Sequence, residues 1–306
     1  MSTPPAPSGG PGDLELTEQQ FRRIAALLRE HAGLTLAEEG HKLVISRLSR
    51  HLRRLGHRSF DAYLRVVTSP AGGAELAQMI DALTTNTTRF YREPEHFDLL
   101  ASRALPRLIR RARAGGRVRI WSAACSSGEE PYSIAATVLE AFPEAARHDL
   151  RILATDINRT MLTRAEAGLY ELRSVRDLAP EIRARLFTPG EREGRAAIRP
   201  ELRALVTFRY LNFMEDWPVT GPFDAIFCRN AAIYMDAATQ LKLWTGFERV
   251  LDEEGLLFIG HSERIGSSLS HRLELFAPTA YRRPAARIVP TPLSSKECHH
   301  VPQELP

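Results

Sequence analysis

The sequence predicts an α/β protein in which a small all-α region precedes a doubly wound, mainly parallel β-sheet. Three observations lead to this fold class. Between residues 14 and 85 apolar residues recur at helical spacing, whereas after about residue 115 short apolar runs alternate with amphipathic stretches. The interval from about 169 to 205 interrupts this alternation with polar, turn-prone sequence, including TPGEREG at 188–194, and predicts a small inserted β-subdomain at about 172–205.

Helix signals justify the all-α region element by element. Thr17 is a candidate N-cap with Gln20 three residues later, which is the spacing of a capping box, and an apolar stripe begins at Phe21. Three further helices are expected: one with Val44, Leu48, Leu52 and Leu55 on one face, one after the candidate cap Ser59, and one with Leu76, Ile80 and Leu83. We expect this domain at 14–85, followed by a linker and connecting helix at 86–114.

The α/β domain is expected at 115–283. Continuous apolar runs separated by helices are typical of buried parallel strands. The expected strands are VRIW (118–121), RILATD (151–156), VTFRYL (206–211), FDAIFC (223–228) and GLLFIG (255–260), with one helix from Pro131 and another from Asp236. The flanking segments 1–13 and 284–306 are rich in proline, glycine and serine, and we predict that they are disordered tails.

Composition restricts the function classes. The 306 residues are 43% hydrophobic and 25% charged, and no apolar stretch approaches the roughly 20 residues of a membrane span. A formal charge of +4 is too small to predict a nucleic-acid partner. Cys125, Cys228 and Cys298 are odd in number and form no CxxC pair, so neither a disulfide framework nor a metal site is expected. We expect a cytoplasmic, monomeric protein that is not embedded in a membrane.

The first βα junction, IWSAACSSGEEPYSIA at 120–135, carries the first functional motif. Small residues let the backbone approach a ligand at the carboxyl end of a strand, where open α/β sheets bind cofactors. The GxGxxG of a dinucleotide site is missing, and Glu129 and Glu130 stand where a pyrophosphate would bind. Two acids suit a cofactor with a cationic amino acid portion, such as S-adenosylmethionine. The alternative is an ordinary helix N-terminus stabilised by acidic side chains.

Two further strand ends carry polar residues. Asp156 ends the second strand, where an acid typically binds the ribose hydroxyls of a nucleoside, although it could instead cap the following helix. CRNAAIYMD (228–236) follows the fourth strand and places Arg229 and Asn230 at the cofactor edge, with Tyr234 one turn later. The NPPY-like loop common in methyltransferases that act on DNA and protein amides is absent here, which argues against an amino-group acceptor.

The domain junction TTNTTRFYREPEHF (84–97) contributes Asn86, Thr88 and Arg92. Taken alone, these residues indicate helix capping and a solvated arginine better than they indicate a binding site.

In combination, the motifs resemble those of the CheR family of chemotaxis receptor methyltransferases. The family patterns NxTxFFR, SAA(S)xGEEPYS, FDxIFCRNxxIYF and GxLFxGHSE are matched by NTTRFYR (86–92), SAACSSGEEPYS (122–133), FDAIFCRNAAIYM (223–235) and GLLFIGHSE (255–263). The resemblance covers about residues 15–283. It implies a protein-glutamate O-methyltransferase with a Rossmann-like S-adenosylmethionine-binding domain, an inserted β-subdomain and an all-α front domain. The departures at Tyr91, Cys125 and Met235 remove no polar group that the chemistry needs.

The resemblance also implies roles for individual residues. The cofactor-binding residues would be Asn86, Thr88, Arg92, Glu130, Asp156, Asn212, Phe213, Arg229 and Asn230. Glu130 would hold the methionyl portion, Asp156 the ribose, and Phe213 with Asn212 the adenine. Arg92 and Tyr234 would lie nearest the methyl donor and are the candidate catalytic residues. The product would be S-adenosylhomocysteine, and the acceptor a glutamate of a methyl-accepting chemoreceptor.

Basic residues on the second predicted helix indicate a partner site. Arg47, Arg50 and Arg54 fall on one stripe at i, i+3 and i+7, with Lys42 and Arg53 alongside. Such a stripe is often only a solvated face. By resemblance it looks like the surface that docks the acidic cytoplasmic helices of chemoreceptors.

Two other functions stay open at this level. One is a non-catalytic receptor adaptor that binds S-adenosylmethionine, and the other is a small-molecule or nucleic-acid methyltransferase on the same fold. The intact polar motifs argue against the first, and the helical front domain argues against the second. We interpret His261 as a hydrogen-bonded residue near a strand end, and assign no function to Cys298, His299 and His300. TPGEREG looks shorter than in family members that tether to a receptor's C-terminal pentapeptide, so we expect action without a tether.

Overall fold

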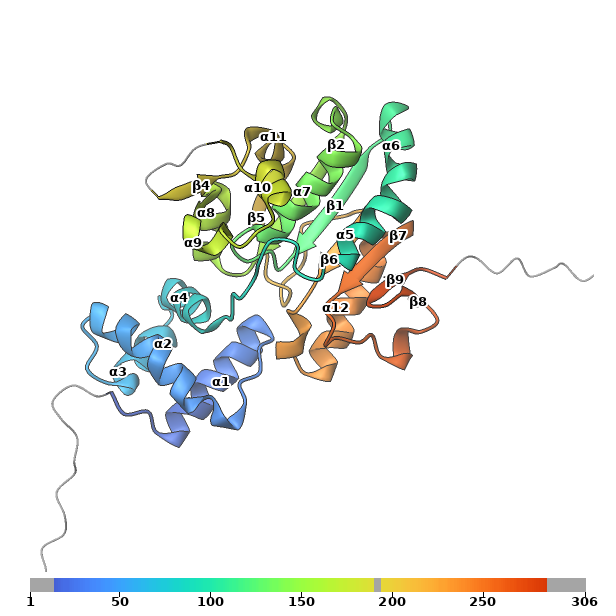
Figure 1. Cartoon of the computed structure of the whole chain (residues 1–306). Helices are drawn as coiled ribbons and strands as arrows, with labels where there is room; N and C mark the ends of the chain where they lie inside the picture. The colour runs from blue at the N-terminus through green and yellow to red at the C-terminus, as the bar shows by residue number, and fades with distance from the viewer. Residues whose placement is uncertain (1–13, 190–193, 285–306) are drawn as a thin grey trace, which may run out of the picture.

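The computed structural model describes residues 14–189 and 194–284, which form two packed parts. Figure 1 shows helices α1–α4 grouped at one side of the molecule, while the β-sheet and its covering helices form the larger part. The predicted tails lie outside the described residues except for Pro284, and so do residues 190–193 of the TPGEREG segment. Within the described ranges, no helix has the length and apolar character needed to cross a membrane.

The four predicted helices of the front part are confirmed. They are α1 (Glu18–Ala32), α2 (His41–Arg54), α3 (Phe60–Val67) and α4 (Gly73–Leu83). Helix α1 starts with a complete capping box, because Thr17 and Gln20 each accept a hydrogen bond from the other's backbone. Ser59 caps α3 in the expected way. The four helices enclose their own apolar core, in which Leu28 and Leu48 are fully buried.

A continuous helical stretch joins the linker to the sheet. It consists of α5 (Glu95–Leu99), the π-helix η2 (Leu100–Ala104) and α6 (Leu105–Arg113). Leu100, Leu105 and Leu108 are buried against the sheet, so this stretch covers one of its faces.

The larger part is built on a seven-stranded sheet in the order β5-β2-β1-β6-β7-β9-β8. Its parallel strands are β1 (Val118–Ala123), β2 (Leu150–Asp156), β5 (Val206–Tyr210), β6 (Phe223–Cys228) and β7 (Leu251–Ile259). These confirm the five predicted strands. The two antiparallel strands at one end of the sheet, β9 (Ala280–Arg282) and the edge strand β8 (Glu274–Ala277), were not predicted, because each is short and neither forms a continuous apolar run.

Helices cover both faces of the sheet, as in a doubly wound Rossmann-like fold. Helix α7 (Glu129–Ala141) packs with α5 and α6 over one face, where Ile120 and Phe227 are buried. Helix α12 (Ala237–Val250) packs over the other face, where Trp121 and Ile226 are buried. Successive residues of one strand therefore point into two separate cores, which explains why the strands are continuous apolar runs.

The segment between β2 and β5 departs from the expected β-subdomain. After α8 (Arg159–Ala167), strand β3 (Leu169–Glu171) pairs antiparallel with β4 (Arg195–Ala197), so a small β-element exists, but it begins before residue 172. Most of the segment's regular structure is helical: α9 (Leu172–Val175), α10 (Pro180–Leu186) and α11 (Pro200–Arg203). Proline at the first position of α10 and α11 is a helix-start signal that the turn-prone composition obscured.

Candidate cofactor pocket and active site

The carboxyl ends of the parallel strands open into a cavity of about 610 Å³ between the sheet and the helical front part. Strand β1 lies between β2 and β6, at the point where the order of strands reverses, and open α/β sheets bind ligands at such a switch point. Every residue predicted to bind the cofactor or to act in catalysis lines this cavity: Asn86, Thr88, Arg92, Glu130, Asp156, Asn212, Phe213, Arg229, Asn230 and Tyr234. The structure therefore brings distant segments of the chain to one place.

The turn between β1 and α7 forms the floor of the cavity. Ala124, Ser126 and Gly128 have positive φ angles of 65°, 50° and 96°. Such backbone is easy only for glycine, and at Gly128 an added Cβ would also lie 2.8 Å from Ala165. Non-glycine residues in this conformation are uncommon and gather at functional sites. The small residues of the motif therefore permit the tight backbone turn between β1 and α7.

Glu130 lies in the cavity wall on the first turn of α7. Its Oε1 accepts a hydrogen bond from the Ser122 hydroxyl at 2.7 Å, and its Oε2 accepts one from Arg229 at 3.0 Å. Burial raises the pKa of Glu130, while Arg229 and Ser122 oppose that shift. Glu129 is not among the lining residues, and it accepts a hydrogen bond from the Ser127 hydroxyl at 2.7 Å instead. Only one of the paired acids therefore faces the cavity.

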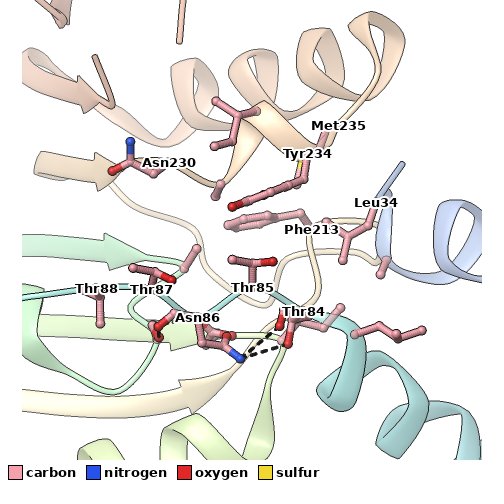
Figure 2. Close-up of a pocket in the computed structure, with 18 of the residues that line it drawn as sticks. Leu34, Thr84, Thr85, Asn86, Thr87, Thr88, Phe213, Asn230, Tyr234 and Met235 are labelled. Atoms are coloured by element: carbon pink, nitrogen blue, oxygen red, sulfur yellow. Dashed lines mark hydrogen bonds between the residues drawn. The ribbon is translucent and has the colours of Figure 1, made fainter. Parts of the chain in front are cut away.

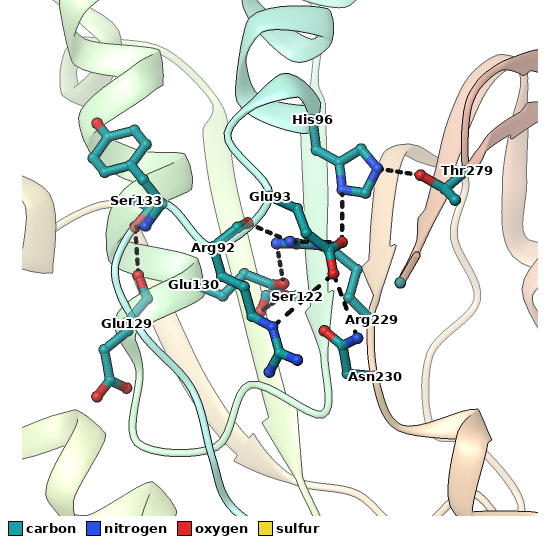
Figure 3. Close-up of polar contacts among 12 residues, drawn as sticks. Arg92, Glu93, His96, Ser122, Glu129, Glu130, Ser133, Arg229, Asn230 and Thr279 are labelled. Carbon is teal, nitrogen blue, oxygen red and sulfur yellow. Dashed lines mark hydrogen bonds and ion pairs between the residues drawn. The ribbon is translucent and has the colours of Figure 1, made fainter. Parts of the chain in front are cut away.

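Two carboxylates hold Arg229 at the end of β6. Its side chain is 2% exposed, and its Nη1 and Nη2 each lie 3.0 Å from an oxygen of Glu130 and Glu93 respectively (Figure 3). Nη2 also donates to the carbonyl of Arg92. Burial alone would raise the pKa of Glu93, but the charge and hydrogen bonds of Arg229 hold it below its ordinary value. Most of the hydrogen-bonding capacity of Arg229 is therefore used within the cavity wall.

Glu93 also faces two histidines. His96 is fully buried with its Nδ1 3.6 Å from Glu93, and burial, with the charge of Arg229, lowers its pKa to about 4. His261 lies 4.0 Å from Glu93, outside the cavity lining, and pairs with Glu95. Ligand atoms of Glu93, His96 and His261 lie within 4.8 Å of one another, a spacing compatible with a metal ion. The nearest Glu93 oxygen already accepts from Arg229, whose charge opposes a cation there, so we describe this cluster as a network of polar side chains around Glu93.

Asp156 ends β2 with both carboxylate oxygens engaged. Oδ2 accepts from the backbone of Ser126 at 2.7 Å, and Oδ1 accepts from the backbone of Asn158 at 2.8 Å. Burial raises the pKa of Asp156, and these backbone donors oppose the shift. The side chain that caps α8 belongs to Asn158, so the alternative interpretation of Asp156 as the helix cap is wrong. A carboxylate can accept about four hydrogen bonds, so Asp156 retains acceptor capacity toward the cavity.

Asn212 and Phe213 follow β5 and meet the front part. The Asn212 amide donates to the carbonyl of His31 at 2.7 Å and to Glu215 at 3.0 Å, and its oxygen accepts from the backbone of Met214. Because both amide hydrogens are taken, the Asn212 side chain mainly anchors α1 to the sheet. Phe213 is the member of the pair whose ring projects into the cavity in Figure 2.

The linker forms the opposite wall. Figure 2 shows residues 84–88 across the cavity from Phe213 and Tyr234. The Asn86 amide donates to Thr84, and the Asn86 carbonyl accepts from Ser126 at 3.1 Å. The short helix η4 (Ala232–Tyr234) carries Tyr234, and its carbonyl accepts from the backbone of Thr35 at 2.7 Å. Both walls are therefore tied to neighbouring segments by hydrogen bonds.

Several lining residues were not predicted. The front part contributes the loop residues Leu34, Thr35, Leu36 and Ala37 together with Leu43, and the α/β part contributes Ile157 and Ile233. Apart from Ile233, which lies within the CRNAAIYMD segment, these residues carry no motif, and those of the front part reach the cavity only because α1 and α2 pack beside it. Glu93, which holds Arg229 in the cavity wall without lining the cavity itself, was also missed.

The GHSE motif acts on the backbone near the cavity. Glu263 is 4% exposed, and its carboxylate accepts backbone hydrogen bonds from Gly260 at 2.5 Å, Asn230 at 2.9 Å and Ala232 at 2.7 Å. An added Cβ at Gly260 would lie 2.5 Å from the Asn230 amide, so glycine permits this close approach. The motif therefore holds the loop that carries Arg229 and Asn230.

The predicted basic stripe on α2 divides into two kinds of side chain. Arg47 donates to the carbonyls of Leu83 and Thr84 at 2.7 and 2.8 Å, so it joins α2 to the end of α4. Arg54 contacts Gln78 and His51. Lys42, Arg50 and Arg53 have exposed side chains on the outer face of α2. The outward-facing stripe therefore lacks Arg47.

A Rossmann-like sheet with buried carboxylates beside the pocket at its switch point fits the class of proteins that bind a nucleoside cofactor with a cationic portion, such as S-adenosylmethionine. Residues 86–281 match the model of the CheR methyltransferase, SAM binding domain, and residues 19–84 match that of the CheR methyltransferase, all-alpha domain. The chain belongs to the CheR methyltransferase family.

Curated relatives cover most of the chain. It is 46% identical over 258 residues to the probable chemotaxis protein methyltransferase of Rhizobium etli. The aligned residues cover 84% of this chain and 96% of that protein. It is 41% identical over 271 residues to the chemotaxis protein methyltransferase of Salmonella typhimurium, with 88% and 91% covered. It is 40% identical over 280 residues to chemotaxis protein methyltransferase 2 of Pseudomonas aeruginosa, with 90% and 97% covered.

Proposed function

We propose that this protein transfers the methyl group of S-adenosylmethionine to glutamate side chains of methyl-accepting chemoreceptors, in chemotaxis adaptation or a related signalling pathway. The products are glutamyl methyl esters and S-adenosylhomocysteine. The observation that carries the proposal is the cavity at the strand ends, where one wall is acidic and the linker and η4 supply Arg92 and Tyr234.

The charges in the cavity support an assignment of the cofactor's parts. Glu130 faces the ammonium of the methionyl portion, and Asp156, at the end of the neighbouring strand, accepts from the ribose hydroxyls. Phe213 offers a ring for the adenine. In this arrangement Arg229 and Asn212 contact the cofactor little, because most of their donors are bonded within the protein. Arg229 acts by positioning Glu130, and Asn212 acts by anchoring α1 beside the cavity.

The chemistry needs no general base. The reference pKa of glutamate is about 4.3, so the acceptor is already a carboxylate near pH 7. Its oxygen attacks the sulfonium methyl in line, an O–C bond forms as the C–S bond breaks, and the electron pair of that bond stays on sulfur. Positioning of the two reactants can supply about 7 to 11 kcal/mol in well-aligned cases.

Arg92 and Tyr234 are the candidates for orienting the acceptor carboxylate. Arg92 is anchored by one hydrogen bond, from Nη1 to the carbonyl of Thr87 at 2.9 Å, and its side chain is 33% exposed. Guanidinium has five donors, so several remain for an incoming carboxylate. The Tyr234 hydroxyl supplies a further donor from the other wall.

The acceptor lies, in our proposal, on the acidic helical cytoplasmic region of the receptor, and α2 supplies the docking surface. Lys42, Arg50 and Arg53 project outward from α2, and Leu43 of the same helix lines the cavity. A partner helix bound along α2 would therefore lie beside the cavity opening. Opposite charges would guide this encounter and weaken with added salt.

Incubation of the protein with methyl-labelled S-adenosylmethionine and receptor-rich membranes tests the proposal. We expect label on the receptor that mild alkali releases, because carboxyl esters hydrolyse and N-methyl groups do not. Label that resists alkali would indicate a different acceptor. A protein that binds S-adenosylhomocysteine but transfers no label would instead be a receptor adaptor, which the intact acidic wall gives no reason to expect.

A further inference from the structure

Glu93 lies in the linker, but its side chain is turned inward and largely buried against Arg229. Its backbone φ is +55°, and Tyr91 two residues earlier has a φ of +50°. Left-handed backbone is unfavourable for a residue other than glycine. The two bends nevertheless turn the Glu93 side chain inward, where it is 10% exposed and its Oε2 lies 3.0 and 3.3 Å from two nitrogens of Arg229. The surrounding contacts therefore maintain an unfavourable backbone in order to place this carboxylate.

The charge balance of the wall changes with Glu93. Arg229 alone would neutralise Glu130, and a neutral pair would attract an ammonium group only weakly. With Glu93 on the other side of the guanidinium, two carboxylates share one cation, which leaves one net negative charge (Figure 3). This charge is buried beside the cavity, where solvent screens it little.

Other groups around Glu93 do not remove that charge. His96 is uncharged near pH 7 because burial lowers its pKa to about 4. Asn230 is neutral, and its amide lies 3.4 Å from Oε1. Arg92 is the nearest further cation, but its Nε is 4.0 Å away and its side chain is partly exposed to water. His261, also 4.0 Å away, is 54% exposed and has Glu95 as its closer partner.

We infer that Glu93 is a positioning residue for cofactor binding: by sharing Arg229 with Glu130, it keeps the methionyl end of the cavity net negative and so selects ligands that carry an ammonium group. The inference rests on the proposed binding of S-adenosylmethionine. Glu93 itself does not line the cavity, so it acts through Arg229 and Glu130.

The test compares two ligands in equilibrium binding. S-Adenosylhomocysteine carries the ammonium, and its deamino analogue keeps the carboxylate but lacks the ammonium. Glu93→Gln preserves the shape of the side chain and removes its charge. We expect about a tenfold weaker affinity for S-adenosylhomocysteine and at most about a twofold change for the analogue. The matched control is Glu95→Gln, which removes an exposed charge two residues away and should change neither affinity.

Two results would overturn the inference. One is an equal weakening of both ligands by Glu93→Gln, which would mean that Glu93 only supports the shape of the pocket, and the other is no change for either. If Glu93→Gln does not fold, Glu93→Asp replaces it, since it keeps the charge. The preference for the ammonium ligand should then stay within about threefold of the wild type, and its loss would count against the inference. Wild-type protein that binds no S-adenosylhomocysteine would contradict the proposed function itself.

Discussion

Glu129 and Glu130 are neighbours in the sequence, yet only Glu130 lines the cavity. From the sequence, the junction motif indicated an acidic site, but which acid faced the ligand depended on the tight turn after β1 and on the position of Arg229. Similarly, the sequence placed Asp156 at a strand end, but only the structure shows that Asn158, and not Asp156, caps the next helix. Glu93 was missed because the importance of one linker acid depends on left-handed backbone that no pattern shows.

Replacement of Glu130 tests the acidic wall directly. Glu130→Gln removes the carboxylate that we assign to the cofactor's ammonium, and we expect its affinity for S-adenosylhomocysteine to fall roughly tenfold or more. Glu129→Gln is the matched control, because Glu129 lies outside the lining, and it should bind nearly as tightly as the wild type. Isothermal titration calorimetry measures both. Equal losses in the two variants would contradict the assignment.

The affinity should also depend on pH through Glu130. Its pKa in the free protein is raised above the ordinary 4.5 by burial, and a bound ammonium would favour the ionised form and lower that pKa again. Affinity is therefore greatest above the free-state pKa and falls as the pH drops through it, beginning at a higher pH than for an ordinary glutamate. Titrations with S-adenosylhomocysteine between neutral and acidic pH measure this. The Glu130→Gln variant should show a flatter profile, and an unchanged profile would refute the explanation.

Replacement of Arg92 tests its assigned role in methyl transfer. Arg92→Ala removes donors that we assign to the acceptor carboxylate, so turnover should fall at least about tenfold while the melting temperature stays near that of the wild type. Steady-state methylation of receptor membranes and thermal unfolding are the two measurements. A folded Arg92→Ala protein with near-normal turnover would remove Arg92 from the mechanism.

At the scale of elements, the helical front part could be predicted from its helical periodicity, and the parallel strands could be predicted because each is a continuous apolar run. The inserted segment could not, since its regular pieces are three to seven residues long and only contacts define them. The α2 stripe shows another limit. Periodicity placed Arg47 with the other basic residues, but α4 packs against that side of the helix and takes up its guanidinium.

A charge reversal on α2 tests the docking surface. We expect Lys42→Glu with Arg50→Glu to weaken receptor methylation several-fold, most strongly at low salt, without changing the affinity for S-adenosylhomocysteine. Arg103→Glu with Arg110→Glu, two exposed cations on η2 and α6, is the control for total charge. Arg47 is left intact because its replacement would loosen α2 from α4. Equal loss in both double variants would argue against docking through α2.

At the scale of the whole molecule, the two parts are joined at the cavity itself. Asp81 of α4 accepts from the backbone of Arg159 and Thr160 at the start of α8, and Asn158 donates to Asp81 and Thr84. Together with the contact between Asn212 and α1, these bonds fix the front part over the strand ends. The order of motifs along the chain indicated two domains, but the sequence alone did not show that the front domain completes the pocket wall.

Identification of the methylated atom tests the proposed reaction most directly. Purified receptor is incubated with the protein and with S-adenosylmethionine carrying a deuterated methyl group, and receptor peptides are then examined by mass spectrometry before and after mild alkali. We predict deuterated methyl esters on glutamate side chains that alkali removes and that form at least about tenfold more slowly with Arg92→Ala protein. Deuterated methyl groups on any other side chain, or none on the receptor, would contradict this prediction.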